Sequence, residues 1–135
     1  MKNFIPFILS FLIFSCTKSY NPAVVSARQE ASEIGLEIMK NGGNAYDAMI
    51  ATHLALAVVH PTAGNIGGGG FFVYYDQSGE SGSLDFREMA PGNAFKDMYL
   101  DENGDVIPDM STLGGAAVGV PGSISAIFEI HSKFG

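Results

Sequence analysis

The sequence has one cysteine, Cys16, and no tryptophan among its 135 residues. A single cysteine excludes an internal disulfide framework and any metal site built from several thiolates. Basic residues are scarce too, because 7 Lys and Arg against 14 Asp and Glu give a net charge of −7. Nucleic acids and anionic lipid surfaces bind to clustered cations, which this chain lacks. We therefore expect no nucleic-acid partner.

Familiar catalytic and metal-binding patterns are also missing. No Gly-x-Ser-x-Gly elbow occurs, so the sequence names no nucleophile and no catalytic residue. His53, His60 and His131 do not pair with each other or with a carboxylate at metal-ligand spacing. We expect His53 to be a core or edge histidine with satisfied hydrogen bonds, and His60 to end a helix. We expect no metal and no cofactor.

The acidic stretch around Asp101 and Asp105 invites comparison with a calcium loop, together with Asp109. It lacks the twelve-residue spacing that ends in a glutamate. A solvated acidic turn is the favoured interpretation.

The first sixteen residues resemble an export signal. Lys2 precedes an apolar run over 4–15, which is shorter than the roughly 20 residues that a membrane-spanning helix takes. The run ends in Ile13-Phe14-Ser15-Cys16, which resembles a bacterial lipobox. We predict a signal peptide over 1–16, lipidation of Cys16, a tether over 17–25, and a lipid-anchored periplasmic or cell-envelope location. An ordinary signal peptide with an incidental cysteine is the alternative.

The remaining residues predict an α/β fold. Ser26 and Gln29 resemble a capping box before a helix over 27–40, in which Ala27, Ala31, Ile34 and Ile38 recur at helical spacing. Asn41-Gly42-Gly43 is expected to end this helix, because glycine accepts the left-handed conformation there. Asn44 is expected to cap a second helix over 45–59, which is apolar nearly all round and is therefore predicted to be buried.

An aromatic run predicts a strand over 71–76 that pairs with a strand over 83–87 in a hairpin, and a last helix is predicted over 121–134. Two strands alone are marginally stable. We therefore expect the chain to be part of a larger domain.

A run of four glycines, at 67–70, precedes the first strand. Phosphate-binding loops follow a strand and open a helix, and they carry a Lys-Ser/Thr pair that is missing here. The favoured interpretation is a tight backbone crossing at which side chains would clash.

Arg87 is the strongest candidate for a binding residue. A guanidinium grips a carboxylate through two parallel hydrogen bonds, so an arginine at a strand end can hold an acidic substrate. Asp85 and Glu88 are close in sequence. A structural ion pair with one of them is the alternative, and local sequence alone favours it.

Several segments together resemble the N-terminal part of the large subunit of γ-glutamyltransferases, also called glutathione hydrolases. They occur in order over 26–135 and lie at 41–48 (Asn41-Gly42-Gly43-Asn44-Ala45-Tyr46-Asp47-Ala48), 54–61, 63–71, 85–91 (Asp85-Phe86-Arg87-Glu88-Met89-Ala90-Pro91) and 119–122. The resemblance implies an N-terminal-nucleophile hydrolase fold, an αββα sandwich of which 26–135 would be the N-terminal portion.

The resemblance also implies a function. The precursor would cut itself, and the new N-terminal threonine of a small subunit would attack γ-glutamyl amides such as glutathione and form an acyl-enzyme. Arg87 would bind the substrate's α-carboxylate. The threonine is absent from these 135 residues, so this chain alone is expected to be inactive.

Two other functions stay open at this point. One is a related enzyme that acts on other amides, either an acylase or a poly-γ-glutamate depolymerase. The other is a non-catalytic exported lipoprotein that keeps this segment as a binding or structural module.

Overall fold

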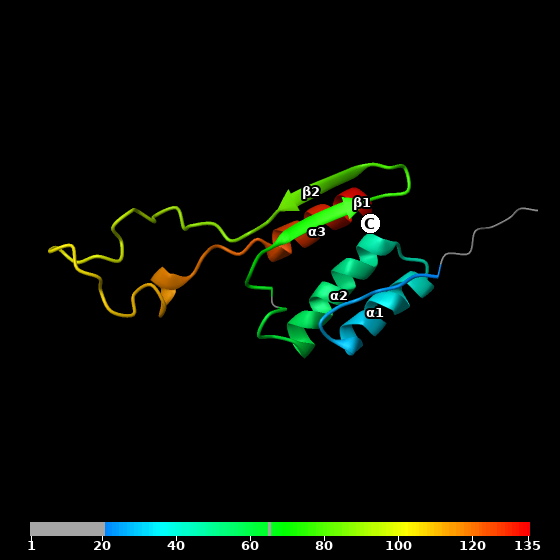
Figure 1. The fold of residues 1–135 in the computed structure, drawn as a ribbon, viewed down its shortest axis with the longest axis horizontal. Coiled ribbons are helices and arrows are strands. Elements are labelled where there is room, and N and C mark those ends of the chain that lie inside the picture. Colours follow the sequence, from blue (N-terminus) through cyan, green and yellow to red (C-terminus); the bar gives the residue numbers. More distant parts are fainter. Residues whose placement is uncertain (1–20, 65) are drawn as a thin grey trace, which may run out of the picture.

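The computed structural model describes residues 21–64 and 66–135, and Figure 1 shows their arrangement. The predicted signal peptide and Cys16 lie outside these residues. The elements are α1 (Gln29–Lys40), α2 (Ala45–Val59), β1 (Phe71–Tyr75), β2 (Ser81–Asp85), the short 3-10 helix η1 (Gly115–Ala117) and α3 (Ser123–Phe134). Within the described ranges, no helix is both long enough and apolar enough to cross a membrane.

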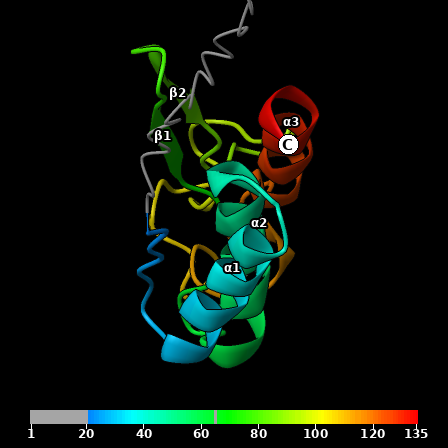
Figure 2. The ribbon, with the colours of Figure 1, turned by 90° about the vertical axis from the view of Figure 1, so that its right-hand side faces the viewer.

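The helices and the hairpin form two layers. Helices α1 and α2 lie side by side, α3 packs against α2, and the β1–β2 hairpin lies over α3 (Figures 1 and 2). A long segment between β2 and α3 extends away from this body and returns to it (Figure 1). The core between the layers contains Ile50, Ala126 and Ile130.

Helix α1 begins later than the sequence predicted. Arg28, with an extended backbone, is the residue before its first turn, and no side chain caps it. The predicted capping box at Ser26 is therefore wrong, because the Ser26 hydroxyl instead contacts the Arg28 carbonyl at 2.7 Å and the Ser32 hydroxyl at 2.8 Å. The buried face also differs, since Ala31 and Gly35 are buried while Ile34 is 42% exposed.

The junction between α1 and α2 follows the prediction. Gly42 has a φ of 100°, a left-handed conformation that glycine adopts without strain. Asn44 then caps α2, and its side-chain oxygen accepts hydrogen bonds from the backbone N–H groups of Tyr46 (2.7 Å) and Asp47 (3.0 Å). The Asp47 carboxylate accepts in return from the Asn44 N–H, which completes a capping box.

Helix α2 is less buried than its composition predicted. Ala48, Ile50 and Thr52 are buried, but Leu54 is 43% exposed and Val58 is 79% exposed. The prediction of a helix buried all round is wrong for these residues, because α1 and α3 cover two of its sides and leave a third open.

The hairpin is present with a shifted second strand. Phe71 lies opposite Asp85, and Tyr75 lies opposite Ser81. The second strand therefore covers 81–85 and not the predicted 83–87, a shift of two residues toward the N-terminus. The turn closes at Asp76, whose carboxylate accepts from the Ser78 N–H (2.8 Å), the Ser78 hydroxyl (2.6 Å) and the Glu80 N–H (3.0 Å). The second strand begins directly after this network, at Ser81.

An aromatic cluster joins the hairpin to the helices. The Tyr46 ring stacks on Phe134 at 4.6 Å between centroids, while Phe72 and Tyr74 pack beside them from β1. The Asn44 side chain also donates to the Phe134 carbonyl at 2.6 Å. One residue therefore caps the start of α2 and holds the end of α3.

Candidate functional site

The backbone around Arg87 is fixed from two sides. Before it, the Phe86 N–H donates to the Gly70 carbonyl at 3.0 Å. After it, Met89 and Val120 exchange two backbone hydrogen bonds, at 3.1 and 2.8 Å. Arg87 lies two residues beyond the end of β2, so the prediction that it is the last residue of this strand is wrong, but paired backbone segments flank it on both sides.

The glycine run forms the tight crossing that its composition predicted. A Cβ atom on Gly69 would lie 2.6 Å from the Phe86 carbonyl oxygen and 2.7 Å from the Cα of Arg87. A Cβ on Gly122 would also collide with the Phe86 carbonyl oxygen. The Gly68 carbonyl accepts from the N–H groups of Gly122 (3.0 Å) and Ser123 (3.1 Å). Three chain segments therefore pass one another here at backbone contact distance.

The Arg87 side chain lies on the surface beside Asp85. Its Nε and Nη2 donate to the two Asp85 carboxylate oxygens at 3.2 and 3.0 Å, and its backbone N–H donates to Asp85 Oδ1 at 3.1 Å. The Arg87 side chain is 62% exposed, and the Asp85 side chain is 53% exposed. The ion pair that the sequence left open as an alternative is therefore present, with Asp85 as the partner.

The ion pair uses one edge of the guanidinium. A guanidinium has five N–H donors, and Asp85 takes two of them, so three remain on Nη1 and Nη2. Hydrogen bonds from Arg87 hold the pKa of the Asp85 carboxyl below its usual range, and the same bonds raise the pKa of Arg87. Both groups stay charged near neutral pH, and Arg87 keeps a free edge for a second carboxylate.

Phe71 completes the surroundings of Arg87, and the sequence interpretation missed it. The guanidinium carbon lies over the Phe71 ring at 4.7 Å from the centroid. Phe71 is the cross-strand partner of Asp85, so the two side chains share a face of the hairpin. A correct prediction of the hairpin register would have placed Phe71 opposite Asp85 and so beside Arg87.

An open hollow of about 630 Å³ adjoins these residues. Asp85, Arg87, Glu88 and Met89 line it. The hollow therefore combines one cation, two carboxylates and a thioether on the surface, which suits a charged ligand better than an apolar one.

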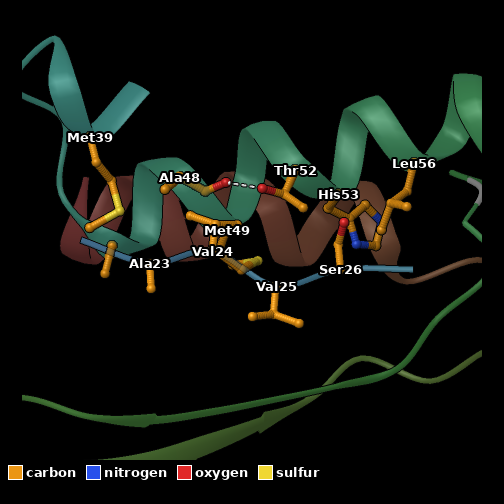
Figure 3. A pocket seen from close by; sticks show the side chains of 11 residues that line it. Ala23, Val24, Val25, Ser26, Met39, Ala48, Met49, Thr52, His53 and Leu56 are labelled. Carbon is orange, nitrogen blue, oxygen red and sulfur yellow. Dashed lines mark hydrogen bonds between the residues drawn. The ribbon is translucent and has the colours of Figure 1, made fainter. Parts of the chain in front are cut away.

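A second cavity lies elsewhere and is mostly apolar. It has a volume of about 430 Å³ and lies between α2 and the extended segment around Val24 and Ser26 (Figure 3). Thr52 lines this cavity, and its hydroxyl donates to the Ala48 carbonyl at 2.7 Å. His53 also lines it, and the buried His53 Nε2 has no hydrogen-bond partner among the described residues. The prediction that His53 has satisfied hydrogen bonds is therefore wrong for this atom.

The remaining sequence candidates are structural. His60 is the residue that ends α2, as predicted. The Asp101 carboxylate accepts from the backbone N–H groups of Asn103 (2.8 Å) and Asp105 (3.0 Å), so the acidic stretch is an exposed turn. His131 is exposed on α3. In the part of the chain that the structure describes, no three His, Cys, Asp or Glu side chains are grouped as metal ligands.

Comparisons with known proteins place this geometry in a family. Residues 31–135 match the family model described as gamma-glutamyltranspeptidase. A glutathione hydrolase proenzyme from Pseudomonas sp. (strain A14) is 51% identical over 115 residues, which are 85% of this chain and 20% of that protein. The chain thus spans about a fifth of that relative's length.

Solved structures agree with this match. The gamma-glutamyltranspeptidase of Helicobacter pylori is 47% identical, with a TM-score of 0.81 over 86% of this chain and 33% of that chain. The gamma-glutamyltranspeptidase of Pseudomonas nitroreducens complexed with L-DON is 48% identical, with a TM-score of 0.78 over 84% and 33% of the two chains. The fold is thus the N-terminal portion of a γ-glutamyltranspeptidase of the N-terminal-nucleophile hydrolase type, as the sequence predicted, and the chain belongs to the gamma-glutamyltranspeptidase family.

Proposed function

We propose that this chain is the leading part of a longer precursor that hydrolyses or transfers the γ-glutamyl groups of glutathione and related amides. Family membership supports the reaction class, and relatives named glutathione hydrolase proenzyme support the substrate and the precursor form. The attacking group would be a threonine of a small subunit, outside these 135 residues. Reading the gene beyond codon 135 tests this, because a stop there would leave a non-catalytic module.

The role of this chain in that reaction would be to bind substrate through Arg87. The observation that carries the proposal is a charged guanidinium with a free edge, on a backbone fixed by glycine crossings and beside an open hollow. A bidentate contact to the α-carboxylate of a glutamyl group uses that free edge. Such a contact positions the substrate and makes no bond.

The kinetic test uses two substrates in the longer protein. One is γ-glutamyl-p-nitroanilide, and the other is 4-aminobutyryl-p-nitroanilide, which has the same amide but lacks the α-carboxylate. The Arg87→Ala variant should raise KM for the glutamyl substrate by roughly 10- to 100-fold, the range for a lost hydrogen bond to a charged group. KM for the analogue should not change.

The matched control is Arg28→Ala, which removes the other arginine of the chain from the exposed start of α1. It should leave both substrates unaffected. If Arg87→Ala kept the full preference for the glutamyl substrate, Arg87 would not bind the α-carboxylate.

We also propose export with a lipid anchor at Cys16. The lipobox-like Ile13-Phe14-Ser15-Cys16 after a short apolar run supports it. Labelling cells with a palmitate analogue should mark the wild-type chain and not Cys16→Ala. Equal labelling of the two would leave an ordinary signal peptide.

A further inference from the structure

The hairpin places three side chains on one face around the Arg87 guanidinium. Asp85 and Arg87 are two residues apart, so along an extended chain they project to the same side. Phe71 lies directly opposite Asp85 on β1. Arg87 is its diagonal neighbour, at a separation that aromatic and long side chains span. All three are exposed, and the inner face of the same hairpin carries Phe72 and Leu84 instead.

The two neighbours restrain different motions of the guanidinium. The guanidinium carbon lies over the Phe71 ring, 4.7 Å from the ring centroid. Asp85 takes the Nε and Nη2 donors in its plane, at 3.2 and 3.0 Å. The contact with the ring and the two hydrogen bonds together restrain the guanidinium in the orientation that faces its Nε and Nη2 toward Asp85. The edge formed by Nη1 and Nη2 is then the one offered to a ligand.

We infer that Phe71 and Asp85 are positioning residues that hold the Arg87 guanidinium with its Nη1–Nη2 edge ready for the substrate's α-carboxylate. The inference rests on the proposed binding role of Arg87. An exposed arginine loses rotamer freedom when it binds a ligand, and this costs affinity. A side chain already held in the binding orientation avoids most of that loss. Both residues would act through Arg87, because neither a carboxylate nor a phenyl ring has a donor to offer the α-carboxylate.

The test for Phe71 replaces its ring with mono-, di- and trifluorinated phenylalanine in the longer protein. Fluorine withdraws charge from the ring face, which weakens the attraction to a cation while shape and hydrophobicity change little. KM for γ-glutamyl-p-nitroanilide should rise stepwise, by roughly 2- to 5-fold in total, the range for an exposed cation–π contact. The Phe71→Leu variant should show the same rise, and Phe71→Trp should restore the wild-type KM.

The analogue without an α-carboxylate, 4-aminobutyryl-p-nitroanilide, makes the readout specific. A merely structural role for Phe71 would change KM for both substrates, whereas a positioning role changes it for the glutamyl substrate alone. The ratio of the two kcat/KM values does not depend on how much enzyme is correctly folded. The same fluorination at Phe128, a 72% exposed phenylalanine on α3, is the control and should leave the ratio unchanged.

For Asp85, the conservative variant Asp85→Asn keeps the shape but removes the charge and one of the two acceptor oxygens, so at most one of the two side-chain hydrogen bonds from Arg87 remains. It should lower the ratio of kcat/KM values for the glutamyl substrate over the analogue by a few-fold. If the Phe71 and Asp85 variants keep the wild-type ratio while Arg87→Ala lowers it, the positioning role is overturned and the binding role stands. If Arg87→Ala also keeps the ratio, the proposed binding function itself fails.

Discussion

Asn44 connects two helices, and its replacement by alanine is expected to destabilise both. Its side-chain oxygen caps α2 through the Tyr46 and Asp47 N–H groups, and its Nδ2 donates to the Phe134 carbonyl at the end of α3. Loss of an asparagine cap costs about 1 kcal/mol, and loss of a hydrogen bond between elements costs about 1 kcal/mol more. We therefore expect Asn44→Ala to lower the free energy of unfolding by about 2 kcal/mol.

Asn44→Asp separates the two contributions. An aspartate keeps the capping oxygen and adds a favourable negative charge at the helix N-terminus. It cannot donate to the Phe134 carbonyl, so we expect a loss of about 1 kcal/mol from that contact alone. Asn93→Ala is the matched control, because it makes the same substitution at an exposed turn residue outside the helices and strands, and its effect should stay within about 0.5 kcal/mol.

The assay is urea unfolding followed by circular dichroism, combined with amide hydrogen exchange at Tyr46 and Asp47. Exchange at these two amides should accelerate in Asn44→Ala and stay slow in Asn44→Asp, because the aspartate still accepts from both. The exchange measurement reports on the cap even where global unfolding is not cooperative. Equal loss of stability in Asn44→Ala and Asn93→Ala would refute the reasoning.

Two further predictions concern helix packing and pH. Gly35→Ala should destabilise the chain by about 1–3 kcal/mol, although alanine has the better helix propensity, because the new Cβ would collide with Thr52 Oγ1 and approach the Ala48 carbonyl at 3.0 Å. In thermal melting, adding Thr52→Ala to Gly35→Ala should restore part of the lost stability. At the hairpin turn, the hydrogen bond from the Ser78 hydroxyl, followed by backbone N–H donors, lowers the pKa of Asp76. Its stabilising contribution is therefore complete above the ordinary value of 3.8 and is lost as pH falls through the lower folded value; hairpin amide exchange should accelerate in that window in the wild type, and far less in Asp76→Asn.

Local signals in the sequence predicted the junctions well. Asn44 and Gly42 act through their own backbone and nearest neighbours, so their roles do not depend on the rest of the fold. The aromatic run of β1 likewise predicted a strand from composition alone. Features that a few adjacent residues determine were therefore accessible without a structure.

The sequence did not predict features in which one side chain or helix face can contact several alternative neighbours. Ser26 has the right type and spacing to cap α1, but its hydroxyl lies close to Ser32 and Arg28 instead, and the helix starts after Arg28. The open side of α2 depends on which neighbours cover it, and composition does not reveal this. Arg87 was found through the surrounding motifs, while Phe71 became visible only once the strand register placed it opposite Asp85.

The glycine crossing suggests that the position of Arg87 is determined by residues that carry no functional group. Gly69→Ala tests this, because its Cβ would lie 2.6 Å from the Phe86 carbonyl oxygen, 2.7 Å from the Arg87 Cα and 2.8 Å from the Glu88 nitrogen. All three are backbone atoms, so the strain moves the chain that carries Arg87. A misplacement near 1 Å can cost up to about 100-fold in rate.

The Gly69→Ala variant should therefore lower kcat/KM for γ-glutamyl-p-nitroanilide far more than for 4-aminobutyryl-p-nitroanilide. Gly92→Ala is the control, since a Cβ there meets nothing within 4 Å and the residue is free of the left-handed conformation. An equal loss with both substrates would indicate general damage to the fold. A loss confined to the substrate with an α-carboxylate would show that the crossing exists to place one side chain, because Gly69 itself has none to offer a ligand.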